Sequence, residues 1–318
     1  MTFSSFLKLV EIPTKVASMI PFLLGTFYAL YRFNTFHIKN FLLMLVSLLC
    51  IDMATTAINN YQDFKSAYKK HGYGYESHNA IVSYNLKESA VLTAIFILLA
   101  VGTIFGILLF LNSNITVLIL GAISFMIGIF YSFGPIPISH TPFGEIFSGG
   151  FMGLIIPFIA VYIHVFDQNI VNILLQGGRL YLEINMLEVL YIVLMSLSPI
   201  VGIANIMLAN NICDIEDDIE NKRYTLPIFI GKDHALKIFK ILYYIGYAAL
   251  MILLALRITP VVSAITLGTF VLVNKNVKSF YEKQTKKDTF VLAVKNFVVV
   301  NMTLVFTIAA AAAIKYII

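Results

Sequence analysis

Long, uninterrupted apolar runs constrain this chain more than any other feature of its sequence. Nine of them approach the roughly 20 residues that an α-helix needs to cross the hydrocarbon core of a bilayer. We place them at 16–33, 38–58, 89–111, 115–133, 143–166, 186–209, 235–256, 258–274 and 294–317. Because 59% of the residues are hydrophobic and only 12% are charged, a soluble domain is excluded.

In lipid, every backbone polar group must be paired within its own segment or within a closed sheet. A β-barrel uses alternating segments of about ten residues, whereas these runs are continuous and longer. The sequence therefore predicts an all-α, multi-pass membrane protein in which residues 1–318 form one transmembrane domain.

The distribution of basic residues predicts how the chain sits in the membrane. With the N-terminus in the cytoplasm, 17 of the 22 Lys and Arg residues lie inside and 5 lie outside. The positive-inside rule then places the two long polar loops, 64–88 and 214–234, on the cytoplasmic side of a cell membrane. The net charge of +5 fits this topology and contact with anionic lipid, and we expect no nucleic-acid partner.

A short motif occurs twice in the chain. Residues 59–64 (NNYQDF) and 210–215 (NNICDI) share both Asn residues and the Asp at an offset of 151 positions. Each copy ends an apolar run and precedes one of the two long loops. The match predicts two related four-helix halves and a ninth helix around a central cavity, with a functional site between the halves.

The spacing of the acidic residues favours a metal–phosphate site. On a helix, residues four apart share a face, which aligns Asn59 with Asp63 and Asn210 with Asp214 and Asp218. Carboxylate and amide oxygens suit a hard cation such as Mg²⁺, whose remaining ligands are usually water and substrate phosphates. We expect these four helix-end residues to bind metal: Asn59, Asp63, Asp214 and Asp218.

Further polar side chains surround the two motifs. Lys65, Lys222 and Arg223 follow the motifs closely and can neutralise a diphosphate, with Asn210 and Asn211 beside it. Asp52 and Tyr131 are either cavity residues or structural contacts. With the metal holding the diphosphate, an allylic carbocation can form in an apolar cavity and be captured by an electron-rich acceptor.

Three passages make the chain resemble the UbiA superfamily of intramembrane prenyltransferases, and within it the MenA-type branch of 1,4-dihydroxy-2-naphthoate polyprenyltransferases. They are Asn59-x-x-x-Asp63, the segment 131–137 (YSFGPIP) with 142–145 (PFGE), and 210–218 (NNICDIEDD) with 222–231 (KRYTLPIFIG). The resemblance extends over nearly the whole chain. It implies a nine-helix ring, Mg²⁺ dependence, a polyprenyl diphosphate donor and an aromatic acceptor in menaquinone biosynthesis.

The same resemblance assigns metal–diphosphate roles to Asn59, Asp63, Asp214 and Asp218, and basic roles to Lys65, Lys222 and Arg223. The first motif departs from the branch at several positions: Asn60 stands where Asp is common, Ala67 or Lys69 where a further acid is expected, and His78-Asn79 where a basic residue is usual. We therefore expect the second motif to be the stronger metal anchor.

Two other interpretations remain open at this point. Haem, chlorin or hydroxybenzoate prenylation would use the same motifs with a different acceptor. An ion-coupled secondary transporter also combines internal repeats with intramembrane acids, although transporter sites usually lie near the bilayer midplane rather than at helix ends. A membrane scaffold would not require paired Asn-x-x-x-Asp stripes.

Overall fold

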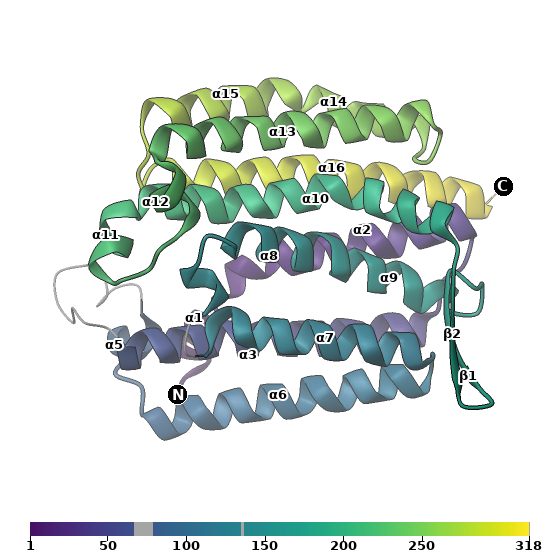
Figure 1. The fold of residues 1–318 in the computed structure, drawn as a ribbon, viewed down its shortest axis with the longest axis horizontal. Coiled ribbons are helices and arrows are strands. Elements are labelled where there is room, and N and C mark those ends of the chain that lie inside the picture. The colour runs from purple at the N-terminus through teal and green to yellow at the C-terminus, as the bar shows by residue number, and fades with distance from the viewer. Residues whose placement is uncertain (67–78, 135–136, 318) are drawn as a thin grey trace.

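The computed structural model describes residues 1–66, 79–134 and 137–317, and it consists of long, nearly parallel helices (Figure 1). The first half contains, in order, α1 Phe3–Leu9, the 3₁₀ helix η1 Ile12–Lys15, α2 Val16–Phe33, α3 Ile38–Ser66, α5 Ala80–Ser83, α6 Glu88–Leu111 and α7 Ile115–Ser132. It continues with the 3₁₀ helix η2 Ile138–His140, α8 Gly144–Gly150, the π-helix η3 Phe151–Ile155 and α9 Ile156–Val165.

A hairpin, β1 Val171–Gln176 and β2 Arg179–Ile184, precedes the second half. That half contains α10 Met186–Cys213, α11 Ile215–Glu220, α12 Leu226–Ile230, α13 Lys232–Ala255, the 3₁₀ helix η4 Val261–Ala264, α14 Ile265–Gly268, α15 Phe270–Glu282 and α16 Phe290–Ile317. The predicted all-α class is confirmed, because the hairpin is the one sheet in the described part of the chain.

Within the described residues, eight helical segments are long and apolar enough to cross a membrane. They coincide with eight of the nine predicted runs. The remaining run, 258–274, forms three consecutive short pieces, η4, α14 and α15, rather than one helix. Pro260 caps η4 at its start, and the helix is interrupted again after Gly268, since proline and glycine are the poorest helix formers.

Successive helices alternate in direction, so the two motifs lie at the same end of the bundle (Figure 1). The C-terminal ends of α3 and α10 lie there, together with α11 and α12, whereas the hairpin lies at the opposite end. The segmented run η4–α14–α15 also runs along the bundle, so α16 ends at the same end as the hairpin (Figure 1).

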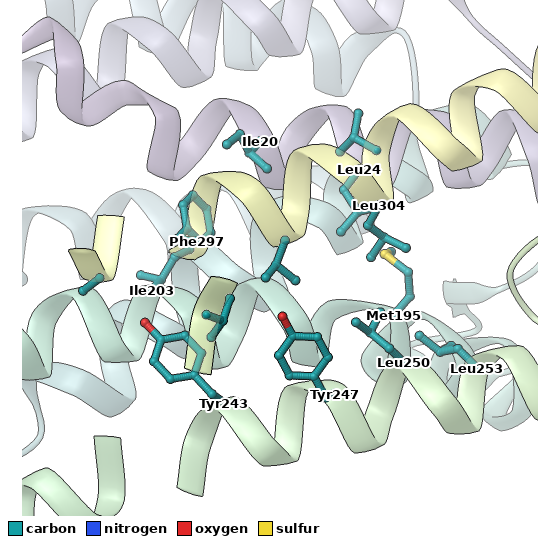
Figure 2. Close-up of a cluster of buried hydrophobic side chains, with 14 of the residues drawn as sticks. Ile20, Leu24, Met195, Ile203, Tyr243, Tyr247, Leu250, Leu253, Phe297 and Leu304 are labelled. Carbon is teal, nitrogen blue, oxygen red and sulfur yellow. The ribbon is translucent and has the colours of Figure 1, made fainter. Parts of the chain in front are cut away.

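The principal core joins α2, α10, α13 and α16, whose buried side chains interlock in Figure 2. Gly202 of α10 allows close packing, since a Cβ atom there would lie 2.7 Å from the ring of Phe297 on α16. On the other side of the bundle, α6 and α7 leave large apolar side chains exposed, for example Phe96 and Leu111 of α6. Lipid is the solvent that such a surface requires.

The hairpin is an element that the predicted all-helical architecture did not include. Its strands pair from Val171 opposite Ile184 to Gln176 opposite Arg179. Gly177 and Gly178, both with positive φ, make the two-residue turn that glycine pairs favour in hairpins. The adjacent glycines that form the turn are visible in the sequence, but they lie outside the nine predicted apolar runs.

Candidate active site

The first motif ends α3, where Asn59 and Asp63 lie one turn apart near the helix terminus. A guanidinium from the other half of the chain holds Asp63. Arg223 Nη2 donates to Asp63 Oδ1 at 2.6 Å, and each side chain is about one-third exposed, at 33% and 34%. The two predicted half-sites are therefore in direct contact, as a shared site requires.

The second motif lies at a helix junction. Asn210 belongs to the last turn of α10, and Asp214 separates α10 from α11. Asn210 Nδ2 donates to Asp214 Oδ2 at 3.2 Å. Lys286, from the loop between α15 and α16, donates to Asn210 Oδ1 at 2.5 Å and also to Asp214 Oδ2. This ammonium gives the second motif a counter-charge of its own.

Asp218 is the most buried of the motif carboxylates, at 6% exposure. Its backbone N–H donates to the Asp214 carbonyl at 2.7 Å, which confirms the predicted helical spacing. Thr225 Oγ1 donates to Asp218 Oδ2 at 3.2 Å. Burial raises the pKa of Asp218 to about 6, and the nearby Arg223 charge opposes that shift.

The loop after α11 is fixed by backbone bonds that aim Arg223 across the site. The Arg223 N–H donates to the Asp218 carbonyl at 2.8 Å, and the Tyr224 N–H donates to the His140 carbonyl at 3.0 Å. The His140 imidazole is itself partly buried. Burial, assisted by the Arg223 charge, lowers the pKa of His140 to about 4, so the ring is neutral at physiological pH.

Asn211 faces a different partner from its neighbour Asn210. It is buried, and its Nδ2 donates to Glu145 Oε1 in the first turn of α8 at 2.9 Å. Tyr131, near the end of α7, lies close enough to Glu145 for the two side chains to interact. The structure thus places Asn211 and Tyr131 around one buried carboxyl group beside the second motif.

Two predicted residues make contacts elsewhere. Asp52 lies deeper along α3 and forms a buried ion pair with Lys15, whose Nζ lies 2.5 Å from Asp52 Oδ1. Ser18 also donates to Asp52. Asp52 therefore makes a structural contact, and its place in a substrate cavity stays a prediction. Lys65 pairs at 2.7 Å with Glu88, at the start of α6.

The remaining neighbours of the motifs differ in burial. Asn60 is buried and joins α3 to the N-terminal segment, with Nδ2 3.2 Å from the Leu9 carbonyl and 3.1 Å from Glu11 Oε1. Lys222 is exposed and has a left-handed backbone, with φ of 56°. Ala67, Lys69 and His78 lie outside the described residues.

The donor set suits a hard divalent cation, although it is not a closed metal cage. Across residues 1–66, 79–134 and 137–317, no group of three or more His, Cys, Asp and Glu side chains is arranged to hold a metal. Mg²⁺ commonly takes only one or two carboxylates and completes its shell with water and phosphate oxygens. Asp63, Asp214 and Asp218 fit that use, with cationic side chains now paired to the first two.

Comparison with known proteins identifies the family. The model of the UbiA prenyltransferase family matches residues 18–314, which is nearly the whole chain. The chain belongs to this family. The predicted resemblance and the predicted enzyme class, a prenyltransferase, are confirmed.

Individual relatives agree with this assignment. The chain is 31% identical over 237 residues to 1,4-dihydroxy-2-naphthoate octaprenyltransferase of Bacillus subtilis (strain 168), covering 74% of this chain and 68% of that protein. A UbiA homologue of Archaeoglobus fulgidus bound to GPP and Mg²⁺ shares the fold with a TM-score of 0.69 at 14% identity, over 97% of this chain and 99% of that one. A UbiA homologue of Aeropyrum pernix K1 in its apo form matches with a TM-score of 0.67 at 17% identity, over 91% and 97%.

Sequence reasoning did not single out Lys286, the cation beside Asp214. Lys286 belongs to a Lys-rich stretch between the last two helices, and that stretch had a sufficient explanation in topology and anionic lipid. Nothing in its local sequence separates Lys286 from Lys283 or Lys287. Only the packing of the α15–α16 loop against the end of α10 selects it.

Proposed function

We propose that this chain transfers a polyprenyl group from an allylic diphosphate to an aromatic acceptor, with Mg²⁺ as cofactor. The contact between Arg223 and Asp63 carries the proposal, because it joins the two Asn-x-x-x-Asp ends at one end of an apolar bundle. A diphosphate needs both carboxylate-bound metal and cationic side chains close together. The GPP and Mg²⁺ in the Archaeoglobus homologue support the same donor class and metal.

The carboxylates of Asp63, Asp214 and Asp218, assisted by the amide oxygen of Asn59, would hold the cation. When bound, Mg²⁺ neutralises charge on the departing diphosphate. Arg223 and Lys286 already lie against two of these carboxylates. With these carboxylates on a cation, the Arg223 and Lys286 side chains would turn toward phosphate oxygens, and Asn210 would donate to the same anion.

The apolar bundle supplies the rest of the chemistry. An allylic cation forms as the carbon–oxygen bond to the diphosphate breaks, and an environment poor in water protects that cation until the acceptor ring captures it. The prenyl tail can extend toward lipid, where the surfaces of α6 and α7 are apolar. A hollow of about 440 Å³ is lined by α6 and by the N-terminal residues Met1 and Phe6, and none of the predicted site residues lines it, so the central cavity stays a prediction.

The acceptor we favour is 1,4-dihydroxy-2-naphthoate, with loss of its carboxyl group to give a demethylmenaquinone precursor. The name of the Bacillus relative supports this choice, and haem, chlorin and hydroxybenzoate acceptors are the alternatives. We further propose that the protein lies in the cell membrane with the motif end facing the cytoplasm. The excess of Lys and Arg in the loops at that end supports this orientation.

The decisive experiment is a product assay. Detergent-purified protein, Mg²⁺, dihydroxynaphthoate and a long-chain allylic diphosphate should yield prenylated naphthoquinol and pyrophosphate in equal amounts. Addition of a chelator should stop the reaction, and fresh Mg²⁺ should restore it. Folded protein that gives no product with dihydroxynaphthoate, hydroxybenzoate or haem would refute the proposal. Mg²⁺-independent ion flux in vesicles would then favour the transporter.

A further inference from the structure

A buried carboxyl group beside the second motif has half of its hydrogen-bonding capacity unused. Glu145 is 4% exposed, and its Oε1 accepts the bond from Asn211. Its other oxygen, Oε2, is buried and has no hydrogen-bond partner within the described parts of the chain. No Lys or Arg of those parts forms an ion pair with it. A buried carboxyl oxygen without a partner is costly, and each such group in a native protein calls for an explanation.

Close packing holds this carboxyl group in place. Gly149 lies one turn after Glu145 on α8, and a Cβ atom there would lie 2.8 Å from the Ile200 carbonyl oxygen of α10. At Gly153 a Cβ atom would lie 2.4 Å from the Cα atom of Ile200. The backbones of α8, η3 and α10 are therefore in direct contact. The Glu145–Asn211 pair rests on this rigid contact rather than on a loop.

The location of Glu145 relates it to the acceptor rather than to the diphosphate. Glu145 is bonded to Asn211, whereas the preceding residue, Asn210, contacts Lys286 and Asp214. The charged groups therefore contact the sequence neighbour of the residue that holds Glu145. Tyr131 of α7 adds an aromatic side chain close to the same carboxyl group. A carboxylate that holds no metal repels a phosphate, whereas a ring hydroxyl can donate a hydrogen bond to it.

We propose that Glu145 Oε2 binds a ring hydroxyl of the aromatic acceptor, and this inference rests on the proposed prenyl transfer. A hydroxyl group both donates and accepts hydrogen bonds, so it pairs with either protonation state of the carboxyl group. Asn211 holds the opposite oxygen and sets the orientation of the carboxyl plane. The bond orients the acceptor ring and fixes which ring carbon faces the allylic carbon of the donor.

The test compares two substitutions with three acceptors, dihydroxynaphthoate and its two mono-O-methyl ethers. Glu145→Leu removes the bond to the hydroxyl, and we expect the KM for dihydroxynaphthoate to rise about 10-fold to 100-fold. The KM for the prenyl diphosphate should stay within about 2-fold, because Glu145 does not contact it. Glu145→Gln keeps the bond to Asn211 and one polar group for the hydroxyl, so its effect should be smaller.

The other two acceptors are the mono-O-methylated naphthoates, with each hydroxyl methylated in turn. With wild-type protein, the KM for one of the two ethers should exceed the KM for dihydroxynaphthoate by about the factor that Glu145→Leu produces. In Glu145→Leu, the KM for that same ether should rise little further. Ser196→Ala is the matched control: it removes another buried side-chain oxygen, the Ser196 hydroxyl of α10, which has no partner among the described residues, and both KM values should be unchanged.

The outcomes separate this inference from the proposed function. Wild-type protein without product overturns both. If wild-type protein is active but Glu145→Leu raises the KM equally for the hydroxy and both methoxy acceptors, only the role of Glu145 is overturned. Where Glu145→Leu does not fold, the same acceptors are compared in the near-isosteric Glu145→Gln, and changes in KM that are equal for the hydroxy and both methoxy acceptors overturn the inference.

Discussion

The ends of α3 and α10 have the same Asn-x-x-x-Asp pattern but different surroundings. At the end of α3, Asp63 is one-third exposed and is held by Arg223 from the other half. At the end of α10, Asp214 and Asp218 are supported by Lys286 and Thr225, all from the second half. The counter-charges of both ends therefore come from the C-terminal half of the chain.

This difference teaches that a repeat in sequence need not give a symmetrical site. The end of α3 supplies the carboxylate of Asp63, whose cationic partner, Arg223, belongs to the second half of the chain. The second half supplies both the carboxylates of the second motif and the residues that bind them. Four predictions test this asymmetry.

The largest effects should come from the carboxylates themselves. Asp214→Asn should reduce kcat/KM about 10³-fold or more, since it removes a proposed metal ligand and also releases Lys286 and Asn210. Asp63→Asn should reduce kcat/KM about 10²-fold. Steady-state kinetics would measure both, with Asp217→Asn as a control that stays near wild type. Equal losses at Asp63 and Asp214, or a greater loss at Asp63, would break the asymmetry.

Burial of Asp218 predicts a pH dependence of stability in metal-free protein. Its pKa is raised from 3.8 to about 6, so between these values the folded state keeps a proton that the unfolded chain has lost. The free energy of unfolding is thus greatest below the lower value and falls, by about 3 kcal/mol at most, as pH rises through about 6.

His140, with a pKa lowered to about 4, acts in the opposite direction, so the comparison must be with a variant. Thermal unfolding of wild type and Asp218→Asn with a chelator, from about pH 4 to 8, should give curves that diverge across this window. Parallel curves would mean that Asp218 is as hydrated as a surface carboxylate.

Lys286→Met should have a moderate effect. It removes the cation beside Asp214 but leaves the metal ligands, so we expect the KM for prenyl diphosphate to rise about 10-fold, as for one charge-assisted hydrogen bond. Lys283→Met is the matched control from the same loop, since Lys283 pairs with the exposed Asp288. Similar effects from both substitutions would return Lys286 to a general role in topology.

Lys65→Met should have the smallest effect. Lys65 was expected to bind the diphosphate, yet its ammonium pairs with Glu88 and is 47% exposed. We expect a loss of about 3-fold or less, in keeping with a solvent-exposed pair. A 10-fold rise in the KM for the prenyl diphosphate would instead restore Lys65 to the site and make the two helix ends more alike.

Most of the fold could be predicted from the sequence, because a bilayer imposes its thickness on every spanning helix. The run at 115–133 became α7, Ile115–Ser132, and the run at 89–111 became α6 almost unchanged. Helical spacing likewise predicted that Asp218 follows Asp214 on one face. The break in the run after Pro260 and the hairpin at Gly177–Gly178 were harder to predict, since each depends on only one or two residues.

The long-range contacts of the site could not be predicted. Asp63 and Arg223 are 160 positions apart, and no pattern in either segment says that they meet. In the same way, nothing in the sequence around Asp52 identifies Lys15 as its partner. Such pairings depend on how the helices pack, which the hydrophobic pattern of each helix does not specify.

The contact between Arg223 and Asp63 also has a consequence for biosynthesis. The ribosome makes Asp63 first, and its cation follows 160 residues later. At roughly 5–20 residues per second, that interval is about 8–32 s. Throughout it, the nascent α3 carries an acid at the membrane surface without its final partner. The two helix ends can therefore be joined through this contact only after residue 223 has been synthesised, and the first half of the chain enters the membrane before its site is assembled.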